Sequence, residues 1–308
     1  MVMVRVLSNV ELPINFKNEV VDWGYYDNEE QNESLFQKSM KMMSLDKKKK
    51  AQHRAIVLHV HGGGFIAMNS AAHQSYTRLW ANNLNIPVFS VDYRLSPQYK
   101  FPAALNDVWQ VYYWLVENAE AIMGLKVDKI ILAGDSAGGN LVAALTVMAI
   151  ERKYRIPDGL ILAYPAITCS QLQFVPSLLM SMDDPILGYP FMKMCLDCYV
   201  GGLDARNPNC VPETSPYISP LVASDETLKQ FPKTRIMIAS SDPLRDQGLQ
   251  FAYKLLKNDV DTFVKEYMYF PHGFLSMGAP IYGMKDEVNE SIRQVEKWIL
   301  ECIMDHTR

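Results

Sequence analysis

The chain has 308 residues, of which 49% are hydrophobic and 21% are charged, and its formal net charge at pH 7 is −4. This length allows one large domain or two small ones, and the composition supplies enough apolar side chains for a sizeable core, which argues against extensive disorder. The acidic balance argues against a nucleic-acid-binding surface, and no apolar run reaches the ~18 residues of a membrane-spanning helix.

The first segment, residues 1–54, carries no chemical motif. Its apolar start is interrupted by Arg5 and is too short for the core of a signal peptide. We expect residues 1–50 to contribute part of a helical cap. The five cysteines are scattered and odd in number, which favours free thiols and predicts a cytoplasmic location. Cys195 and Cys198 form a C-x-x-C pair, but no second pair or nearby histidine completes a zinc site, so we predict two thiols on one face of a helix and no metal there.

From residue 56 onward, short apolar runs alternate with segments that have apolar residues at helical spacing. The short runs predict buried strands, and the longer segments predict helices. Such alternation favours a mostly parallel sheet flanked by helices. Strands are predicted at residues 56–60, 86–91, 129–133, 159–164, 234–240 and 263–270, and helices at about 71–84, 102–120, 141–150 and 286–302.

The first of these strands ends at His-Gly-Gly-Gly-Phe, residues 61–65. Successive glycines let the backbone turn its N–H groups toward a ligand. A phosphate-binding loop fits poorly, because the G-x-G-x-x-G spacing is absent and no Lys-Ser/Thr pair follows. We therefore predict that the amides of Gly63 and Gly64 donate to an oxyanion, and we interpret His61 as a structural brace of the loop.

Residues 134–138 read G-x-S-x-G, between the strand at 129–133 and an apolar, helix-prone segment. In a nucleophile elbow, glycines stand where a side chain would collide as the strand turns into the helix. Ser136 would then be held in strained geometry with its hydroxyl exposed. The amide of Ala137, the next residue, is expected to be the third oxyanion donor.

From about residue 168 to residue 215 the pattern changes to methionine-rich and aromatic segments broken by prolines. A doubly wound sheet needs no such residues between two strands, so they predict an inserted helical cap, in which methionine suits an adaptable apolar lining. With residues 1–50, this insertion is expected to cover the active site of a single domain that spans residues 1–308.

Asp242 and His272 each follow a predicted strand. Groups just past the carboxyl ends of parallel strands meet at one edge of the sheet, where Ser136 is also expected. The chain order Ser136, Asp242, His272 is that of a Ser-acid-His triad in α/β-hydrolases. Asp246 is interpreted as a helix N-cap rather than as the acid. The other histidines are poorly placed as a base, since they lie in polar segments, within a strand or at the C-terminus: His53, His59, His73 and His306.

Together these motifs resemble the hormone-sensitive lipase family of α/β-hydrolases, which includes microbial carboxylesterases and arylacetamide deacetylase-like enzymes. The resemblance runs from about Ile56 to the C-terminus, and residues 133–141 and 207–221 look most like the catalytic part of hormone-sensitive lipase. It implies an α/β-hydrolase fold, a mostly helical cap and ester hydrolysis without metal or organic cofactor. The motifs that carry it lie at residues 61–65, 92–97, 101–104, 134–140, 242–244 and 272–274.

The sequence thus predicts a serine carboxylesterase that acts on a small apolar ester with a short to medium acyl chain. Two alternatives stay open: a lipase that acts on acylglycerols or sterol esters, and a non-catalytic receptor that binds an apolar acid on the same fold. Amide deacetylation is also left open. No nucleic-acid partner and no integral membrane segment are predicted, and the sequence leaves homodimer formation undecided.

Overall fold

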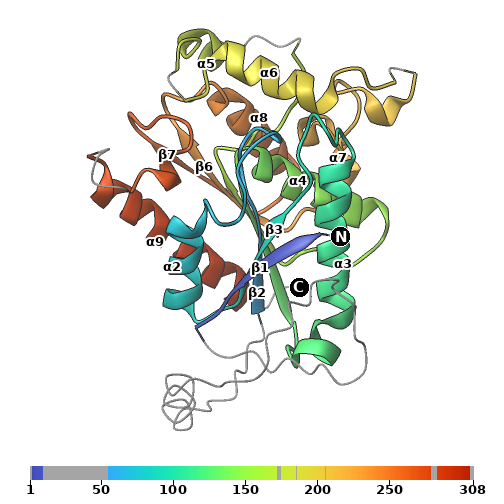
Figure 1. Cartoon of the computed structure of the whole chain (residues 1–308), viewed down its shortest axis with the longest axis vertical. Helices are drawn as coiled ribbons and strands as arrows, with labels where there is room; N and C mark the ends of the chain where they lie inside the picture. The colour runs from blue at the N-terminus through green and yellow to red at the C-terminus, as the bar shows by residue number, and fades with distance from the viewer. Residues whose placement is uncertain are drawn as a thin grey trace, which may run out of the picture.

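The computed structural model describes residues 2–9, 55–171, 175–184, 186–204, 206–278 and 283–305. These residues form a seven-stranded sheet with helices on both of its faces (Figure 1). The strand order is β1-β3-β2-β4-β5-β6-β7, and every neighbouring pair is parallel except β1 with β3. The predicted mostly parallel sheet is confirmed. The strands are β1 Met3–Leu7, β2 Ala55–Val60, β3 Val88–Asp92, β4 Lys129–Asp135, β5 Gly159–Ala163, β6 Lys233–Ala239 and β7 Thr262–Tyr267.

Both faces of the sheet are covered, which explains why the central strands are apolar throughout rather than alternating. In β4, Ile130 and Leu132 point into one hydrophobic cluster, whereas Ile131 and Ala133 point into a second cluster on the opposite face. The first cluster is completed by α3 (Ala103–Met123), α4 (Ala137–Glu151) and α8 (Arg245–Lys257), and the second by α2 (Gln74–Leu84) and α9 (Lys285–Met304).

The N-terminal strand differs from the prediction. Met3–Leu7 pairs antiparallel with β3, with Met3 opposite Asp92, so these residues belong to the sheet and not to a cap. Because β1 is an edge strand with partly exposed side chains, it lacks the buried apolar pattern that marks the central strands. The rest of the predicted N-terminal cap, residues 10–50, lies outside the described residues, as do His53 and His306.

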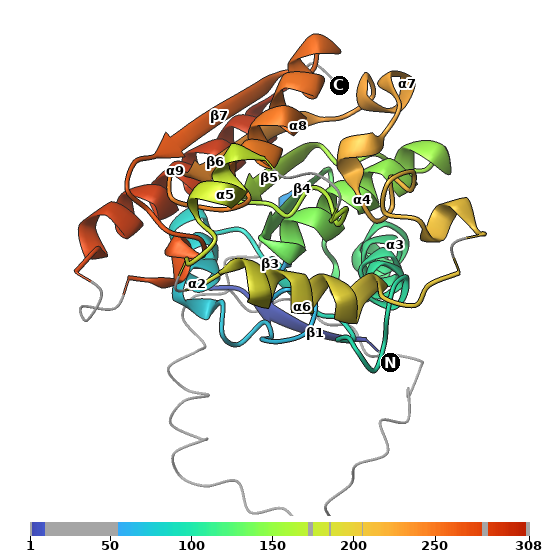
Figure 2. The same ribbon diagram turned by 90° about the horizontal axis from the view of Figure 1, so that it is seen from above.

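The long connection between β5 and β6 holds two helices, α5 (Pro176–Met180) and α6 (Tyr189–Val200), and then the short α7 (Asp225–Leu228). Figure 1 shows α5 and α6 at the top of the molecule, and in Figure 2 they lie in front of the sheet. Both fall within the segment predicted as a cap, residues 168–215. In the described residues, none of the helices combines the length and apolarity needed to cross a membrane.

Candidate active site

Ser136 alone separates β4 from α4, and its φ of 53° is unusual for a residue with a side chain. Glycines on either side make this turn possible. A Cβ on Gly134 would lie 2.4 Å from the carbonyl oxygen of Gly138, and one on Gly138 would lie 2.0 Å from that of Val60. Any side chain there would push the helix off the sheet. The local sequence therefore produces a tight elbow with Ser136 at its tip.

Three side chains that are far apart in the sequence form a hydrogen-bonded chain at this elbow. His272 Nε2 lies 2.8 Å from Ser136 Oγ, and His272 Nδ1 lies 2.8 Å from Asp242 Oδ2. The other carboxylate oxygen of Asp242 accepts from the amide of Leu244 at 2.8 Å. Ser136, His272 and Asp242 are 8%, 5% and 1% exposed. The structure thus brings together the three residues that the sequence singled out as a triad.

The imidazole of His272 is in a setting suited to accepting a proton. Burial by itself lowers its pKa, but the carboxylate of Asp242, together with those of Asp135 and Asp184, outweighs that effect and raises the pKa above 6.5. When neutral, the ring donates from Nδ1 to Asp242, which leaves Nε2 free to accept from the hydroxyl of Ser136. The ring of Tyr164 packs edge-on against the imidazole, with 5.0 Å between centroids. The tautomer needed for general-base catalysis is therefore the one that the hydrogen bonds favour.

The glycine loop after β2 lies beside this elbow. Gly63 and Gly64 have φ values of 110° and 60°, which L-residues with side chains rarely adopt. In the part of the chain that the structure describes, neither amide has a protein acceptor. Gly64, Ser136 and Ala137 line one pocket, and Ala137 is the first residue of α4, where backbone N–H groups have no acceptor within the helix. Two of the three predicted oxyanion donors, Gly64 and Ala137, thus border the same pocket as Ser136, and Gly63 directly precedes Gly64 in the loop.

His61 lies beneath the loop and not at the reacting end of the site. Its Nδ1 is 2.7 Å from the carbonyl oxygen of Gly62, and its ring stacks on Tyr93 at 4.3 Å. The hydroxyl of Tyr93 donates to the backbone carbonyl of His61 at 2.9 Å. Burial lowers the pKa of His61 to about 4, so the ring stays neutral at physiological pH. These contacts agree with a bracing role.

Sequence reasoning missed a buried polar cluster around Asp135. Its carboxylate accepts from the amide of Gly62 at 3.1 Å and from the hydroxyl of Tyr76 at 2.9 Å, and it lies 3.3 Å from Nε2 of His73. Burial disfavours the charged forms of both Asp135 and His73. The attraction between the carboxylate and the imidazolium outweighs this effect, so the pKa of Asp135 is lowered and that of His73 is raised. The available signal was His59, a histidine inside an otherwise apolar strand, whose Nε2 is 3.7 Å from the same carboxylate.

The interpretation of Asp246 as a helix N-cap is wrong. Helix α8 begins at Arg245, with Leu244 at the N-cap, because the amide of Arg245 already bonds to the carbonyl of Asp242. Asp246 therefore lies in the first turn, and its carboxylate accepts from the amide of Ser177 in α5 at 2.9 Å. It links α8 to the inserted helices.

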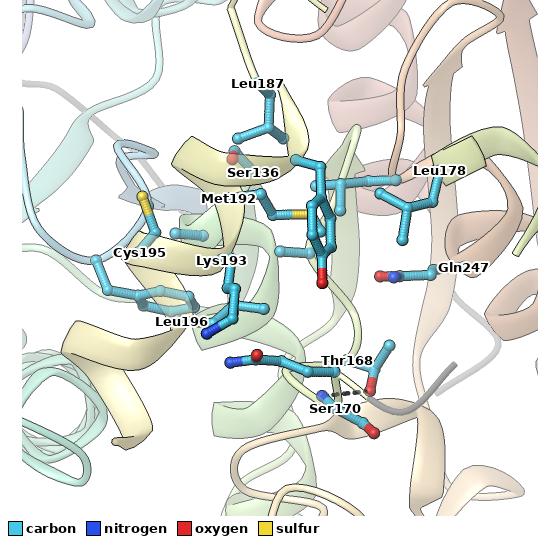
Figure 3. Close-up of a pocket in the computed structure, with 17 residues that line it drawn as sticks. Ser136, Thr168, Ser170, Leu178, Leu187, Met192, Lys193, Cys195, Leu196 and Gln247 are labelled. Carbon is cyan, nitrogen blue, oxygen red and sulfur yellow. Dashed lines mark hydrogen bonds between the residues drawn. The ribbon is translucent and has the colours of Figure 1, made fainter. Parts of the chain in front are cut away.

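A mostly apolar pocket opens beside Ser136 (Figure 3). The insertion provides much of its wall, including Leu178 from α5 and Met192 and Leu196 from α6, and Leu244 completes it from the connection after β6. Its polar lining side chains, apart from Ser136, are Thr168, Ser170, Gln171, Tyr189, Lys193 and Gln247.

The described residues contain no group of three or more His, Cys, Asp or Glu side chains arranged to hold a metal ion. All five cysteines are free, and burial raises the pKa of the Cys195 thiol in the pocket wall to about 11. That thiol is therefore protonated and a poor nucleophile at neutral pH. Among the described pocket residues, the hydroxyl of Ser136 is the one held by a histidine base.

Comparison with known proteins agrees with this geometry. Residues 57–276, more than half of the chain, match the family described as alpha/beta hydrolase fold. The chain belongs to the α/β-hydrolase fold family. The predicted fold class and family resemblance are confirmed.

Relatives in this α/β-hydrolase family include hormone-sensitive lipase from Mus musculus, which is 42% identical over 148 residues. That match covers 48% of this chain but only 19% of the relative, so the chain spans about a fifth of that protein. An arylesterase from Saccharolobus solfataricus is 34% identical over 75% of this chain and 71% of its own length. Among solved structures, an esterase from Pyrobaculum calidifontis superposes with a TM-score of 0.73 at 31% identity, covering 83% of this chain and 79% of that one.

The buried cluster predicts that Asp135 has two separable roles. Asp135→Asn keeps an oxygen for the amide of Gly62 but removes the charge beside His73, so we expect the free energy of unfolding to fall by about 3 to 5 kcal/mol, as for other broken buried pairs. Asp135→Ala also removes the acceptor for Gly62 and should in addition lower kcat by about 10-fold through a loosened oxyanion loop. Urea denaturation and steady-state kinetics with a soluble ester measure both effects.

Asp261→Asn is the matched control, because its carboxylate is 57% exposed and pairs with Arg235 and Lys233 far from the elbow. It should change the free energy of unfolding by at most about 1 kcal/mol and leave kcat unchanged. Equal kcat values for the Asn and Ala variants of Asp135 would contradict the anchoring of the loop.

Proposed function

We propose that this chain is a serine carboxylesterase in which Ser136 is the nucleophile, His272 the general base and Asp242 the acid that orients it. The observation that carries the proposal is the unbroken hydrogen-bond chain from Ser136 through His272 to Asp242, with 2.8 Å at each step, at the edge of an apolar pocket. The named esterases and lipases among the relatives support the same reaction class.

In this mechanism Ser136 Oγ attacks the ester carbonyl carbon as its proton passes to His272 Nε2. A free serine hydroxyl is a poor nucleophile at neutral pH, and the neighbouring base removes that limitation. The carbonyl π electrons move onto oxygen as the new C–O bond forms. Asp242 stabilises the imidazolium that results without taking up the proton itself.

The negative oxygen of this tetrahedral intermediate requires N–H donors, which we assign to Gly63, Gly64 and Ala137. Each such donor contributes about 2.7 to 4 kcal/mol to transition-state stabilisation in hydrolases. The intermediate collapses as the imidazolium gives its proton to the leaving alcohol, which leaves an acyl group on Ser136. His272 then deprotonates a water molecule that attacks the acyl carbon, and the carboxylic acid departs as Ser136 regains its proton.

The substrate we propose is a small apolar ester with a short to medium acyl chain. The walls of the pocket are aliphatic where α5 and α6 meet the elbow, and such a lining favours an alkyl chain over a charged group. Kinetics with p-nitrophenyl esters from acetate to palmitate test this size range. We expect kcat/KM to peak at short to medium chains without any requirement for an oil interface.

A protein that hydrolyses none of these esters and is not labelled at Ser136 by a fluorophosphonate would instead be a non-catalytic receptor. Fluorophosphonate labelling without ester turnover would point to a different acyl substrate, such as an amide.

A lipase is the second candidate, and one specific feature favours it. Six large apolar side chains are exposed on the insertion from α5 to α6, and exposed side chains of this kind suit contact with a lipid interface: Leu179, Met180, Met182, Ile186, Phe191 and Met194. A maximum at palmitate, together with activation by an emulsified triacylglycerol, would select this candidate over the esterase.

We further propose a cytoplasmic location, since all five cysteines are free thiols, as expected in a reducing compartment. The net charge of −4 supports a neutral ester rather than a nucleic acid as the partner. A homodimer is compatible with this proposal and is testable by analytical ultracentrifugation.

A further inference from the structure

One polar side chain of the pocket has no role in the triad or in the oxyanion loop. Gln247 lies in the first turn of α8, five residues after Asp242, and is only 5% exposed. In Figure 3 its side chain points from α8 into the pocket. One terminal atom of its amide, recorded as Oε1, is fully buried and has no hydrogen-bond partner.

The polar neighbours of Gln247 in the pocket wall are already engaged. Thr168 Oγ1 accepts from the amide of Ser170, and Ser170 Oγ donates to Glu213 at 2.8 Å. At the other side, Asp197 accepts from both Gln171 and Lys193. Gln247 differs from these side chains, because its buried amide oxygen can still accept a hydrogen bond from a bound molecule.

An unpaired buried amide oxygen costs about 1 to 3 kcal/mol, and a bound molecule that supplies the missing hydrogen bond explains its place in the pocket wall. Among the described residues that line the pocket, the charged one is Lys193, whose ammonium is already paired with Asp197, so the mostly apolar walls disfavour a charged substituent as the partner. A hydroxyl group fits either orientation of the amide, since it both donates and accepts.

We propose that this pocket selects esters that carry a neutral hydroxyl group on the portion bound next to Gln247. The inference rests on the proposed esterase function and adds a substrate class to it. Gln247 is then a specificity-determining residue: it pairs with the hydroxyl of the preferred ester and stays unpaired when a plain alkyl ester binds. A site built to bond a hydroxyl discriminates against the analogue that lacks it.

Two pairs of esters test the proposal and locate the hydroxyl. The acyl pair is p-nitrophenyl hexanoate and its 6-hydroxy analogue, and the alcohol pair is propyl butyrate and glycerol monobutyrate. We expect the wild-type protein to prefer the hydroxylated member of one pair by about 10-fold in kcat/KM. Preference in the acyl pair places the hydroxyl on the acid, and preference in the alcohol pair places it on the leaving group.

Gln247→Met keeps the length of the side chain and removes its polar atoms, so it should abolish this preference and raise kcat/KM for the plain ester. Because it removes an unpaired buried group, the Tm should stay the same or rise. The control is Gln250→Met, an exposed position one turn further along α8, which should keep the wild-type preference.

Several results would overturn the proposal. One is equal kcat/KM values within both ester pairs for the wild-type protein, and another is a preference for the hydroxylated ester that Gln247→Met retains. A third is a clear fall in the Tm of Gln247→Met, because that would assign Gln247 a structural role. In each case hydrolysis of the plain esters would leave the proposed esterase function standing. If the wild-type protein hydrolysed none of these esters, both the proposed hydroxyl preference and the proposed esterase function would be contradicted.

Discussion

Ser136→Ala is expected to lower kcat for p-nitrophenyl butyrate by about 10⁶-fold, the scale of nucleophile loss in serine hydrolases. The cause is the removal of the only pocket hydroxyl, among the described residues, that His272 Nε2 contacts. Alanine accepts the strained φ of 53° about as well as serine does, and the lost hydrogen bond contributes about 1 kcal/mol, so the Tm should change little. Steady-state kinetics, fluorophosphonate labelling and thermal unfolding measure these three effects.

Ser224→Ala is the matched control. Its hydroxyl is exposed and caps α7, so this variant should keep its activity and its labelling while losing a helix cap. If Ser136→Ala kept more than about a hundredth of the wild-type kcat, far above the 10⁻⁶ expected, another group would have to be the nucleophile.

Asp242→Asn is expected to lower kcat/KM by about 10⁴-fold, because an amide in place of the carboxylate favours the wrong tautomer of His272. It should also shift the pH profile. His272 acts as a base only when neutral, and Asp242 is the main group that raises its pKa against the effect of burial. In the wild-type protein, activity should therefore be lost as the pH falls through that raised pKa. Without the carboxylate, burial dominates, the pKa falls, and the remaining activity should persist to lower pH.

The measurement is kcat/KM against pH for the two proteins over the range in which both stay folded. Asp246→Asn serves as the control, since it removes a negative charge four residues away while the amide oxygen can still accept from Ser177. It should keep the acid limb of the wild type. An unchanged acid limb in Asp242→Asn would mean that Asp242 does not set the pKa of His272.

The features that could be predicted from sequence are those encoded by neighbouring residues. Gly134 and Gly138 specify a tight elbow because each stands where a Cβ would meet backbone within 2.5 Å. The meeting of Asp242 and His272 could also be predicted, because each follows a strand and side chains just past parallel strands share one edge of the sheet. The failed predictions concern weaker local signals: β1 is an exposed edge strand, and α8 begins earlier than its apparent cap, Asp246.

By itself, the sequence determined the order of strands and helices from residue 55 onward around the central sheet, the elbow around Ser136 and the glycine loop, because turns and periodic burial depend on residues adjacent in the chain. The tertiary structure alone decided which polar groups share a buried space. It places Asp135 against His73 and Gly62, and it leaves the amide oxygen of Gln247 unpaired in the wall of the pocket. The physical reason is that two quantities depend on burial and on neighbours within a few ångströms: the pKa of a titratable group, and the free-energy cost of a polar group without a hydrogen bond. Segments distant in the sequence supply both the burial and the neighbours.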